Sequence, residues 1–351
     1  MPRNGALAAL SLQNLAAPLI TACLVAGRVD AGEVDEVIVS NALGAGGNPA
    51  RVIALAAGLP ERVAGLTIDR QCAGGLDAIL LARAMILSGQ AEVVLAGGVE
   101  SYSRRPIRLR TDPGGGTPVA YDQPPFAPWP ARDPDMAEAA AHLALQLGIG
   151  RTAQDVWAIE SHAKARAAAG RMKDEIVAVA GIIADGFTRH LTPALAQRAK
   201  VLTGPITAAN AAIAADGAAM CLVVSDRIAG RAARALRVVG GITMGGSPDQ
   251  PALAPIAAIR SALDRAGIAP QNLALTEIME AYAVQAMACI QGAGLDPLRV
   301  NLGGGGLARG HPIGASGAIL AVRLFHELQH GTALAAIAAA GGIGTALILQ
   351  A

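Results

Sequence analysis

Two residues with reactive side chains lie in glycine-rich segments of this sequence. Each segment is followed by an apolar run that is typical of a helix. Cys72 lies within residues 69–76, which read DRQCAGGL, and His311 lies within residues 303–317, which read GGGGLARGHPIGASG. A cysteine at a helix N-terminus can act as a nucleophile, because free backbone N–H groups and the helix dipole stabilise its thiolate. We interpret the adjacent glycines as room for a substrate. If the histidine lies beside the sulfur, the pair predicts covalent catalysis through Cys72.

Each of these residues also has an ordinary structural interpretation. A buried cysteine most often serves packing alone, and a lone histidine is most often a core or surface residue. The other five histidines we interpret in that way. The glycine runs also resemble phosphate-binding loops. However, no GxGxxG opens the first strand–helix unit and GxxxxGK[ST] is absent from the sequence, so a nucleotide-binding oxidoreductase is the weaker hypothesis.

An internal repeat predicts that Cys72 and His311 meet. A shift of about 240 residues superimposes residues 22–27 on 262–267, 37–39 on 277–279 and 78–80 on 318–320. With a slip of four residues, Gly97-Gly98 falls on Gly341-Gly342. The same shift places His311 on position 71, beside Cys72. Equivalent helix N-termini of a pseudo-twofold molecule can converge on one cleft, so we expect the two side chains to be close.

The repeat also sets the expected domain organisation. Each half reads as helix, short apolar strand, glycine-rich turn, helix and β-rich run, and this alternation predicts an α/β fold. We expect an N-terminal half over residues 1–105, to which 201–232 returns, an insert over 106–200, and a C-terminal half over 233–351. The insert opens with a Pro/Gly-rich stretch that predicts an extended loop, followed by helical patterns over 136–147 and 153–172. It is a candidate lid or substrate-shaping subdomain.

The composition excludes several classes of protein. Hydrophobic residues make up 53% of 351 residues and aromatics only 2%, which predicts a sizeable core of Ala, Val, Leu and Ile. A net charge of +1, without basic clusters interleaved with aromatics, argues against nucleic acid as a partner. The four cysteines show no CxxC pairing, so we expect reduced thiols, no metal site and a cytoplasmic protein.

Two apolar stretches could be mistaken for membrane segments. Residues 5–27 are interrupted by Gln13, Asn14 and Pro18, and no cleavage site follows. Residues 331–351 carry no charge but contain the sequence GGIG. We therefore expect a buried strand–turn–strand there and no membrane span.

In this order, the motifs resemble those of thiolases over nearly the whole chain. They are NPAR at 48–51, the Cys72 segment, GGVES at 97–101, DGAA at 216–219, EAYA at 280–283, the His311 segment and the terminal glycine-rich turn. The resemblance implies a duplicated five-layer α-β-α-β-α fold with pseudo-twofold symmetry, in a homodimer or homotetramer. It also implies an acyltransferase whose substrate is a coenzyme A thioester and which holds no tightly bound cofactor.

The resemblance assigns roles to individual positions. Cys72 matches the acyl-accepting cysteine, and His311 matches the histidine that activates it. The family's second cysteine, the base for the α-proton, is replaced by Ala338, and the asparagine that holds an oxyanion-hole water is replaced by Met279. Backbone N–H groups near Cys72 and Ala340 remain available as oxyanion donors.

The coenzyme A contacts also depart from the family pattern. The expected positions are Ala212, Met244, Gly245 and Tyr282, and Ala212 replaces a serine that contacts coenzyme A. A histidine of the pantetheine loop aligns with Asp135, whose charge would repel phosphates. The phosphates could instead meet basic side chains of the insert, namely Arg166, Arg171, Lys173, Arg198 and Lys200. We expect weak, salt-sensitive binding.

These replacements predict acyl-cysteine formation with impaired thiolysis. Loss of the base and of the second oxyanion site together would cost roughly 10⁵-fold in rate. We therefore expect an acetyl-CoA C-acyltransferase-like enzyme acting on an acyl-CoA or acyl-carrier substrate. A decarboxylative condensing enzyme or another acyltransferase that needs only the Cys–His pair stays open, as does a non-catalytic thiolase-like partner subunit.

Overall fold

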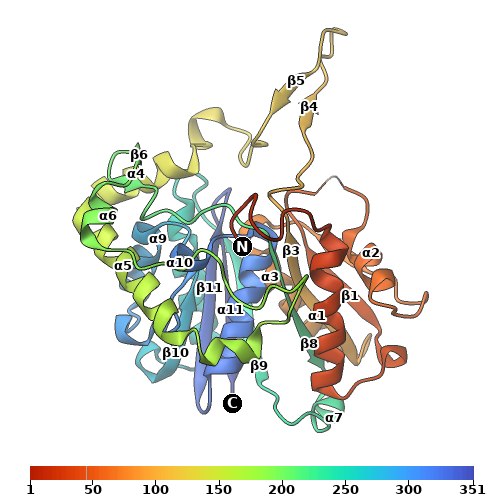
Figure 1. Ribbon diagram of the computed structural model, residues 1–351. Helices are drawn as coiled ribbons and strands as arrows, with labels where there is room; N and C mark the ends of the chain where they lie inside the picture. The colour runs from red at the N-terminus through yellow and green to blue at the C-terminus, as the bar shows by residue number, and fades with distance from the viewer. Residues whose placement is uncertain (45) are drawn as a thin grey trace.

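Two four-stranded sheets organise the computed structural model, which describes residues 1–44 and 46–351 (Figure 1). The first sheet has the order β2-β1-β3-β8, and the second has the order β10-β11-β12-β9. Their strands are β1 (Glu36–Ser40), β2 (Leu66–Ile68), β3 (Val93–Glu100), β8 (Gly217–Val224), β9 (Arg237–Gly245), β10 (Leu273–Ile278), β11 (Thr332–Ala339) and β12 (Ile343–Gln350). In each sheet a parallel pair is followed by an antiparallel one.

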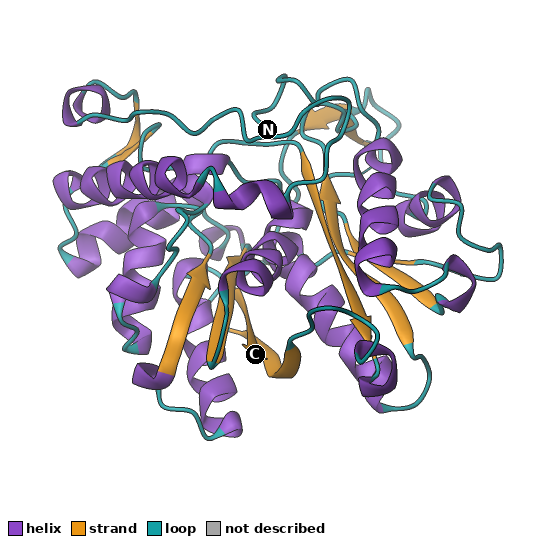
Figure 2. Cartoon of the chain, turned by 60° about the horizontal axis from the view of Figure 1, so that its bottom comes forward, coloured by secondary structure: helices purple, strands orange, loops and turns teal. Residues whose placement is uncertain are grey.

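Helices form three layers around these sheets. The α-helices are α1 (Leu12–Gly27), α2 (Pro49–Ala56), α3 (Gly74–Leu87), α4 (Met136–Leu147), α5 (Arg151–Ala168), α6 (Pro193–Gln197), α7 (Asp226–Ala229), α8 (Ala254–Ala266), α9 (Ala283–Ala293), α10 (Gly306–Arg309) and α11 (Ile313–Glu327). Helices α3 and α11 pack against each other between the sheets, whereas α1 and α2 cover the outer face of the first sheet and α8 and α9 that of the second (Figure 2). The predicted five-layer order is confirmed.

The alternation of side chains along each central strand explains this layering. On β3, Leu95 and Val99 join the core under α1 and α2, whereas Val94 and Ala96 join the core around α3. A strand whose two faces are both apolar must be covered on both sides. Aromatic residues are few in this core. Alanine and glycine are small, and they let the helices pack close to the sheets and to each other.

The register of the sheets corrects one detail of the predicted repeat. Glu36 pairs with Val94 in the first sheet, and adding 240 to both numbers gives Thr276 and Leu334, which pair in the second sheet. The offset thus holds without a slip along these strands, and Gly98 corresponds to Ala338. The predicted match of Gly97-Gly98 with Gly341-Gly342 is wrong, because the first pair lies within β3 and the second lies in the turn between β11 and β12.

The chain between β3 and β8 forms the insert. Helices α4 and α5 agree with the predicted helical patterns to within a few residues. The stretch predicted as a loop contains β5 (Val119–Tyr121), which pairs with β4 (Arg108–Arg110) in a projecting hairpin (Figure 1). Farther along the chain, β6 (Val201–Thr203) pairs with β7 (Ile206–Thr207). The Glu280 carboxylate ties the insert to the C-terminal half, because it accepts hydrogen bonds from Trp157 and Ser161 of α5.

Short 3₁₀ helices connect the main elements. They are η1 (Ala31–Glu33), η2 (Gln71–Ala73), η3 (Pro130–Arg132), η4 (Arg171–Glu175), η5 (Pro251–Leu253), η6 (Pro270–Asn272) and η7 (Pro297–Arg299). The two apolar stretches become α1 and the antiparallel pair β11–β12, as the strand–turn–strand prediction requires. None of the helices in the described residues has both the length and the apolar character needed to cross a membrane.

Candidate active site

A sharp turn presents Cys72 at the start of α3. Gln71 has a left-handed backbone conformation (φ 50°), which is uncommon for a residue other than glycine. The Asp69 carboxylate holds this turn by accepting a hydrogen bond from the Gln71 N–H at 2.8 Å. Cys72 itself lies in η2, which leads directly into α3. Cys72 is half-buried as a residue, and its side chain packs against the central core.

The glycines after Cys72 serve packing rather than substrate access. A Cβ at Gly74 would overlap Ser40 on β1, and a Cβ at Gly75 would overlap the backbone of Ala318 on α11. These contacts seat α3 against the first sheet and against the second central helix. The expectation that these glycines leave room for substrate is therefore wrong, because protein atoms occupy that space.

The structure brings His311 to Cys72, as the repeat offset predicts. The distance from His311 Nε2 to Cys72 Sγ is 3.2 Å. His311 precedes α11, and its backbone N–H donates to the Ile213 carbonyl at 2.8 Å. Gly310 has φ 100°, and a Cβ there would lie 2.8 Å from Ala215, so glycine permits this turn. Histidine and cysteine thus come from the two halves of the repeat and meet between the sheets.

Ser316 fixes which nitrogen of His311 carries the proton. His311 Nδ1 lies 2.6 Å from Ser316 Oγ, and Ser316 Oγ donates to the Pro312 carbonyl at 3.0 Å. A serine hydroxyl has one hydrogen, and the Pro312 carbonyl takes it, so the hydroxyl oxygen accepts the Nδ1–H. His311 Nε2 therefore presents its lone pair to the Cys72 thiol. Sequence reasoning missed Ser316, although it lies within the quoted His311 segment.

The local environment keeps both members of the pair neutral at rest. Burial raises the pKa of the Cys72 thiol to about 12; the negative charge of Glu100 adds to this, whereas the N–H groups of Cys72 and Ala340 oppose it. Burial lowers the pKa of His311 to about 4. Removal from water thus opposes the thiolate that the helix N-terminus favours. The proton must leave Sγ as the sulfur attacks.

Two backbone N–H groups face the sulfur and define a candidate oxyanion hole. They belong to Cys72 and to Ala340, the positions expected from the sequence. A carbonyl oxygen bound there would gain negative charge as Sγ attacks its carbon, and preorganised donors stabilise such charge. Because the donors are backbone groups, side-chain substitution leaves them in place.

The two replaced positions offer no side-chain base or amide to this site. Met279 is buried, and its thioether packs against Gly306 and joins the central core. Ala338 lies near the end of β11, two residues before Ala340 and opposite Gly344 of β12. A methyl group cannot accept a proton, and a thioether sulfur is only a weak acceptor.

The expected coenzyme A positions border this region from two elements. Met244 pairs with Gly344 of β12, which also pairs with Ala338, so one strand separates the end of β9 from the end of β11. Gly245 follows Met244 and is exposed. The Ala212 N–H donates to the carbonyl of the residue before Tyr282 at 2.9 Å. Burial chiefly raises the pKa of the Tyr282 hydroxyl above its usual range, and the negative charge of Asp135 raises it further.

Two of the charged residues have partners within the chain. Asp135 is an N-cap: its carboxylate accepts hydrogen bonds from the backbone of α4 at 2.8 and 3.3 Å, which explains an acidic residue at this position. Arg171 pairs with Glu327 at 3.0 Å, and Glu327 ends the 15-residue helix α11. At about 1.5 Å per residue, this end lies roughly 20 Å from His311. Arg171 therefore lies far from the Cys–His pair, and a phosphate contact by Arg171 or Lys173 at the mouth of the cleft stays a prediction.

The remaining basic candidates are exposed, and one lies beside an expected contact. Arg166, Arg198 and Lys200 are solvent-exposed. The Lys200 carbonyl accepts the Ala208 N–H at 2.9 Å, four residues before Ala212. The backbone of Lys200 therefore lies beside the segment that leads to Ala212.

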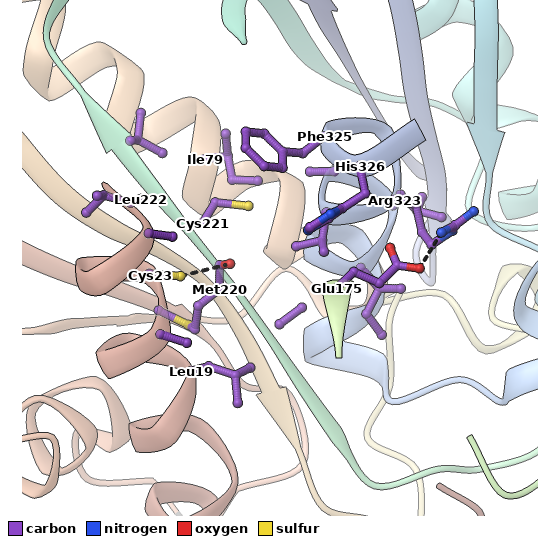
Figure 3. Close-up of a pocket in the computed structure, with 18 of the residues that line it drawn as sticks. Leu19, Cys23, Ile79, Glu175, Met220, Cys221, Leu222, Arg323, Phe325 and His326 are labelled. Atoms are coloured by element: carbon purple, nitrogen blue, oxygen red, sulfur yellow. Dashed lines mark hydrogen bonds and ion pairs between the residues drawn. The ribbon is translucent and has the colours of Figure 1, made fainter. Parts of the chain in front are cut away.

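A cavity extends from the residues that flank His311 to strand β8. It has a volume of about 1220 Å³ and is bounded by β8, β9, α1 and the central helices (Figure 3). Arg323 and Glu175 form an ion pair on its wall, and Ser316 lines it from behind His311, but neither Cys72 nor His311 does so. Within the described residues, no group of three or more His, Cys, Asp or Glu side chains is placed to hold a metal ion.

Comparison with known proteins agrees with this architecture and geometry. Residues 1–227 match the family "Thiolase, N-terminal domain", and residues 233–351 match "Thiolase, C-terminal domain". The chain is 40% identical to "Putative acetyl-CoA C-acetyltransferase YhfS" of Bacillus subtilis (strain 168), over 99% of this chain and 95% of that protein. It is 34% identical to "Putative acetyl-CoA C-acetyltransferase VraB" of Staphylococcus aureus (strain MRSA252), over 90% and 87% of the two chains.

A solved structure shows the same fold. The crystal structure of the Bacillus anthracis acetyl-CoA acetyltransferase superimposes with a TM-score of 0.93 at 32% identity, and the match covers 99% of this chain and 95% of that one. The likeness therefore includes both sheets, the central helices and the insert. The chain belongs to the thiolase family.

Proposed function

We propose that this protein is an acyltransferase in which Cys72 accepts an acyl group from a coenzyme A thioester and passes it to an acceptor. The 3.2 Å contact between His311 Nε2 and Cys72 Sγ is the observation that carries this proposal. The similar proteins from Bacillus subtilis and Staphylococcus aureus are both named "Putative acetyl-CoA C-acetyltransferase", which supports this reaction class.

The first half-reaction needs only the groups in contact. His311 Nε2 takes the thiol proton as Sγ attacks the thioester carbon, and the N–H groups of Cys72 and Ala340 bind the developing oxyanion. Collapse of the intermediate breaks the bond to the coenzyme A sulfur. The His311 imidazolium returns its proton to that leaving thiolate, which leaves acyl-Cys72, free coenzyme A and a neutral imidazole.

The second half-reaction is where this chain departs from an ordinary thiolase. Formation of a carbon–carbon bond needs a carbanion, and Ala338 supplies no base to generate one from an acetyl thioester. Met279 supplies no amide to hold a second oxyanion water. We infer that ordinary thiolysis is slow, by up to roughly 10⁵-fold. The main alternative for this step is a second substrate that loses carbon dioxide, because decarboxylation creates the carbanion without a base.

We further propose a cytoplasmic homodimer or homotetramer that uses acyl-CoA or acyl-carrier substrates, without a tightly bound cofactor. Support for self-association comes from β8, which lies at the edge of the first sheet. Its eight residues, GAAMCLVV, contain no charge or proline, the features that commonly protect exposed edges from pairing. A non-catalytic partner subunit is the less favoured interpretation, because the Cys–His pair and both backbone donors are intact.

Intact-protein mass spectrometry after incubation with a panel of acyl-CoAs tests the proposal. We expect a mass gain of one acyl group, and the rates should rank the donors by chain length. Malonyl-CoA belongs in the panel, since release of carbon dioxide would favour the decarboxylative alternative. A correctly folded protein that gains no mass with any donor would contradict acyl transfer and favour a non-catalytic subunit.

A further inference from the structure

We propose that Glu100 is a positioning residue that seats the His311-bearing end of α11 against the half of the molecule that carries Cys72. This inference rests on the proposed function, because it gives Glu100 a part in the acylation of Cys72. Glu100 is the last residue of β3 and is only 1% exposed. Neither its burial nor its contacts could be read from its place in the GGVES motif.

Four donors surround the Glu100 carboxylate. Oε1 accepts from Asn41 Nδ2 at 2.7 Å and from the Leu43 N–H at 3.2 Å, and Oε2 accepts from the N–H groups of Ala42 and Gly314, each at 3.0 Å. Three of these donors follow β1 in the N-terminal half. The fourth, Gly314, belongs to the first turn of α11 in the C-terminal half. The carboxylate thus bridges the two halves directly beside their shared site.

The N-terminus of α11 lacks an acceptor of its own. Pro312 precedes the helix and makes no side-chain cap, so the first N–H groups need partners from elsewhere. Glu100 supplies one, and a negative charge is favourable at this end of a helix. A Cβ at Gly98 would overlap the Gly314 carbonyl, so the helix end rests directly on β3. His311 lies three residues before Gly314, so the position of this helix end on β3 sets the distance between the His311 imidazole and the Cys72 sulfur.

All four hydrogen bonds require the Glu100 carboxylate to be the acceptor. A protonated Glu100 carries an O–H that finds only donors, so at least one of the four bonds must break. Burial raises the pKa of Glu100 to about 7, and the charge of Asp69 contributes. The other titratable or charged groups nearby are Cys72, Tyr102 and Arg108, which binds the Ala42 carbonyl. As pH falls through 7, Glu100 gains a proton, and its contacts hold the N-terminus of α11 less firmly against the N-terminal half.

The pH profile of Cys72 acylation isolates this effect. With pKa values of about 12 for Cys72 and about 4 for His311, the reacting pair itself does not titrate between pH 5.5 and 8.5. Acetyl-N-acetylcysteamine is a neutral thioester without phosphates, so the donor does not titrate there either. We expect the wild-type acylation rate, measured by rapid quench and intact mass, to fall by up to about tenfold per pH unit below 7.

Glu100→Gln is the diagnostic variant. Its amide nitrogen faces donors, so the seat is loosened at every pH; we expect acylation about 10–100-fold slower at pH 8, with no acid limb. Glu277→Gln is the matched control. Glu277 is also 1% exposed with a pKa raised to about 7, chiefly by burial, but it belongs to β10 and faces Arg323. This control should keep the acid limb.

The possible outcomes separate this inference from the proposed function. Failure of the wild-type protein to acylate at any pH would overturn the proposed function. Acylation at a rate independent of pH from 5.5 to 8.5, or an acid limb that persists in E100Q, would overturn the role of Glu100 alone. If E100Q does not fold, Glu100→Asp decides: it keeps a carboxylate and should be slower with an acid limb, and a flat profile would contradict the inference.

Discussion

At the scale of the residue, a neutral Cys–His pair replaces the standing thiolate that a helix N-terminus first suggests. Burial holds the proton on Cys72 and off His311. Reactivity then depends on the geometry of the proton transfer, since attack and deprotonation must occur together. The groups that orient His311 therefore matter as much as the pair itself. Ser316 is such a group, because its hydroxyl contacts His311 Nδ1.

Ser316→Ala should slow the acylation of Cys72 while leaving the affinity for the thioester nearly unchanged. Without the serine oxygen, Nδ1–H loses its acceptor and the imidazole can turn or adopt the other tautomer. We expect the acylation rate constant to fall about 10–100-fold in single-turnover experiments. Ser88→Ala, at the exposed end of α3, provides the control. Equal rates for both variants would show that Ser316 does not orient the imidazole.

Ala338→Cys should raise the rate of acetoacetyl-CoA thiolysis. A thiol at this position restores a base, and positioned bases typically contribute roughly 10²–10⁴-fold. Adding Met279→Asn should raise the rate further by restoring an amide for the second oxyanion site. The assay follows loss of the acetoacetyl-CoA absorbance. Wild-type turnover already as fast as that of an ordinary thiolase would show that neither replacement limits the reaction.

At the scale of the element, the contact between α3 and α11 fixes where the two reactive residues stand. Gly317 faces the backbone of α3, and a Cβ there would lie 2.6 Å from the Leu76 nitrogen. The small residues of both helices thus bring their N-termini, and with them Cys72 and His311, into one cleft. Close packing of this kind explains Gly75 and Gly317, which lie in the glycine-rich segments that first suggested a phosphate loop.

Gly317→Ala should destabilise the protein even though alanine is the better helix former. The overlap with α3 forces the helices apart, at a cost of about 1–3 kcal/mol in the free energy of unfolding, against a gain of up to about 1 kcal/mol in helix propensity. Urea denaturation measures the difference. Gly32→Ala, whose new methyl group would meet open space, is the control and should change stability little. A Gly317→Ala variant as stable as the control would contradict this packing argument.

Much of this arrangement was predictable from the sequence, and the reasons for the failures are physical. The offset of 240 residues located His311 beside Cys72, because duplicated elements keep their register. The four-residue slip failed because similar glycine pairs occur inside one strand and in a turn. The partners of Glu100 come from a loop and a helix far apart in the chain, and their convergence depends on tertiary packing.

At the scale of the whole molecule, the unpaired edge of the first sheet leads us to expect self-association. Strand β8 ends that sheet, and the 1220 Å³ cavity adjoins it (Figure 3). Light scattering coupled to size-exclusion chromatography should give two or four times the chain mass of 35.2 kDa. Ala218→Lys, which adds a charge to β8, should shift the population toward the monomer. A wild-type protein of single-chain mass at micromolar concentration would contradict the proposed oligomer.

The central claim is that Cys72, and no other cysteine, carries the acyl group with the help of His311. Its most direct test is peptide mapping by mass spectrometry after brief incubation with isotopically labelled acetyl-CoA. We predict label on the peptide that contains Cys72, unchanged labelling in Cys289→Ala, loss of label in Cys72→Ala and strongly slowed labelling in His311→Ala. Label distributed over Cys23, Cys221 and Cys289, or label that survives Cys72→Ala, would contradict the account.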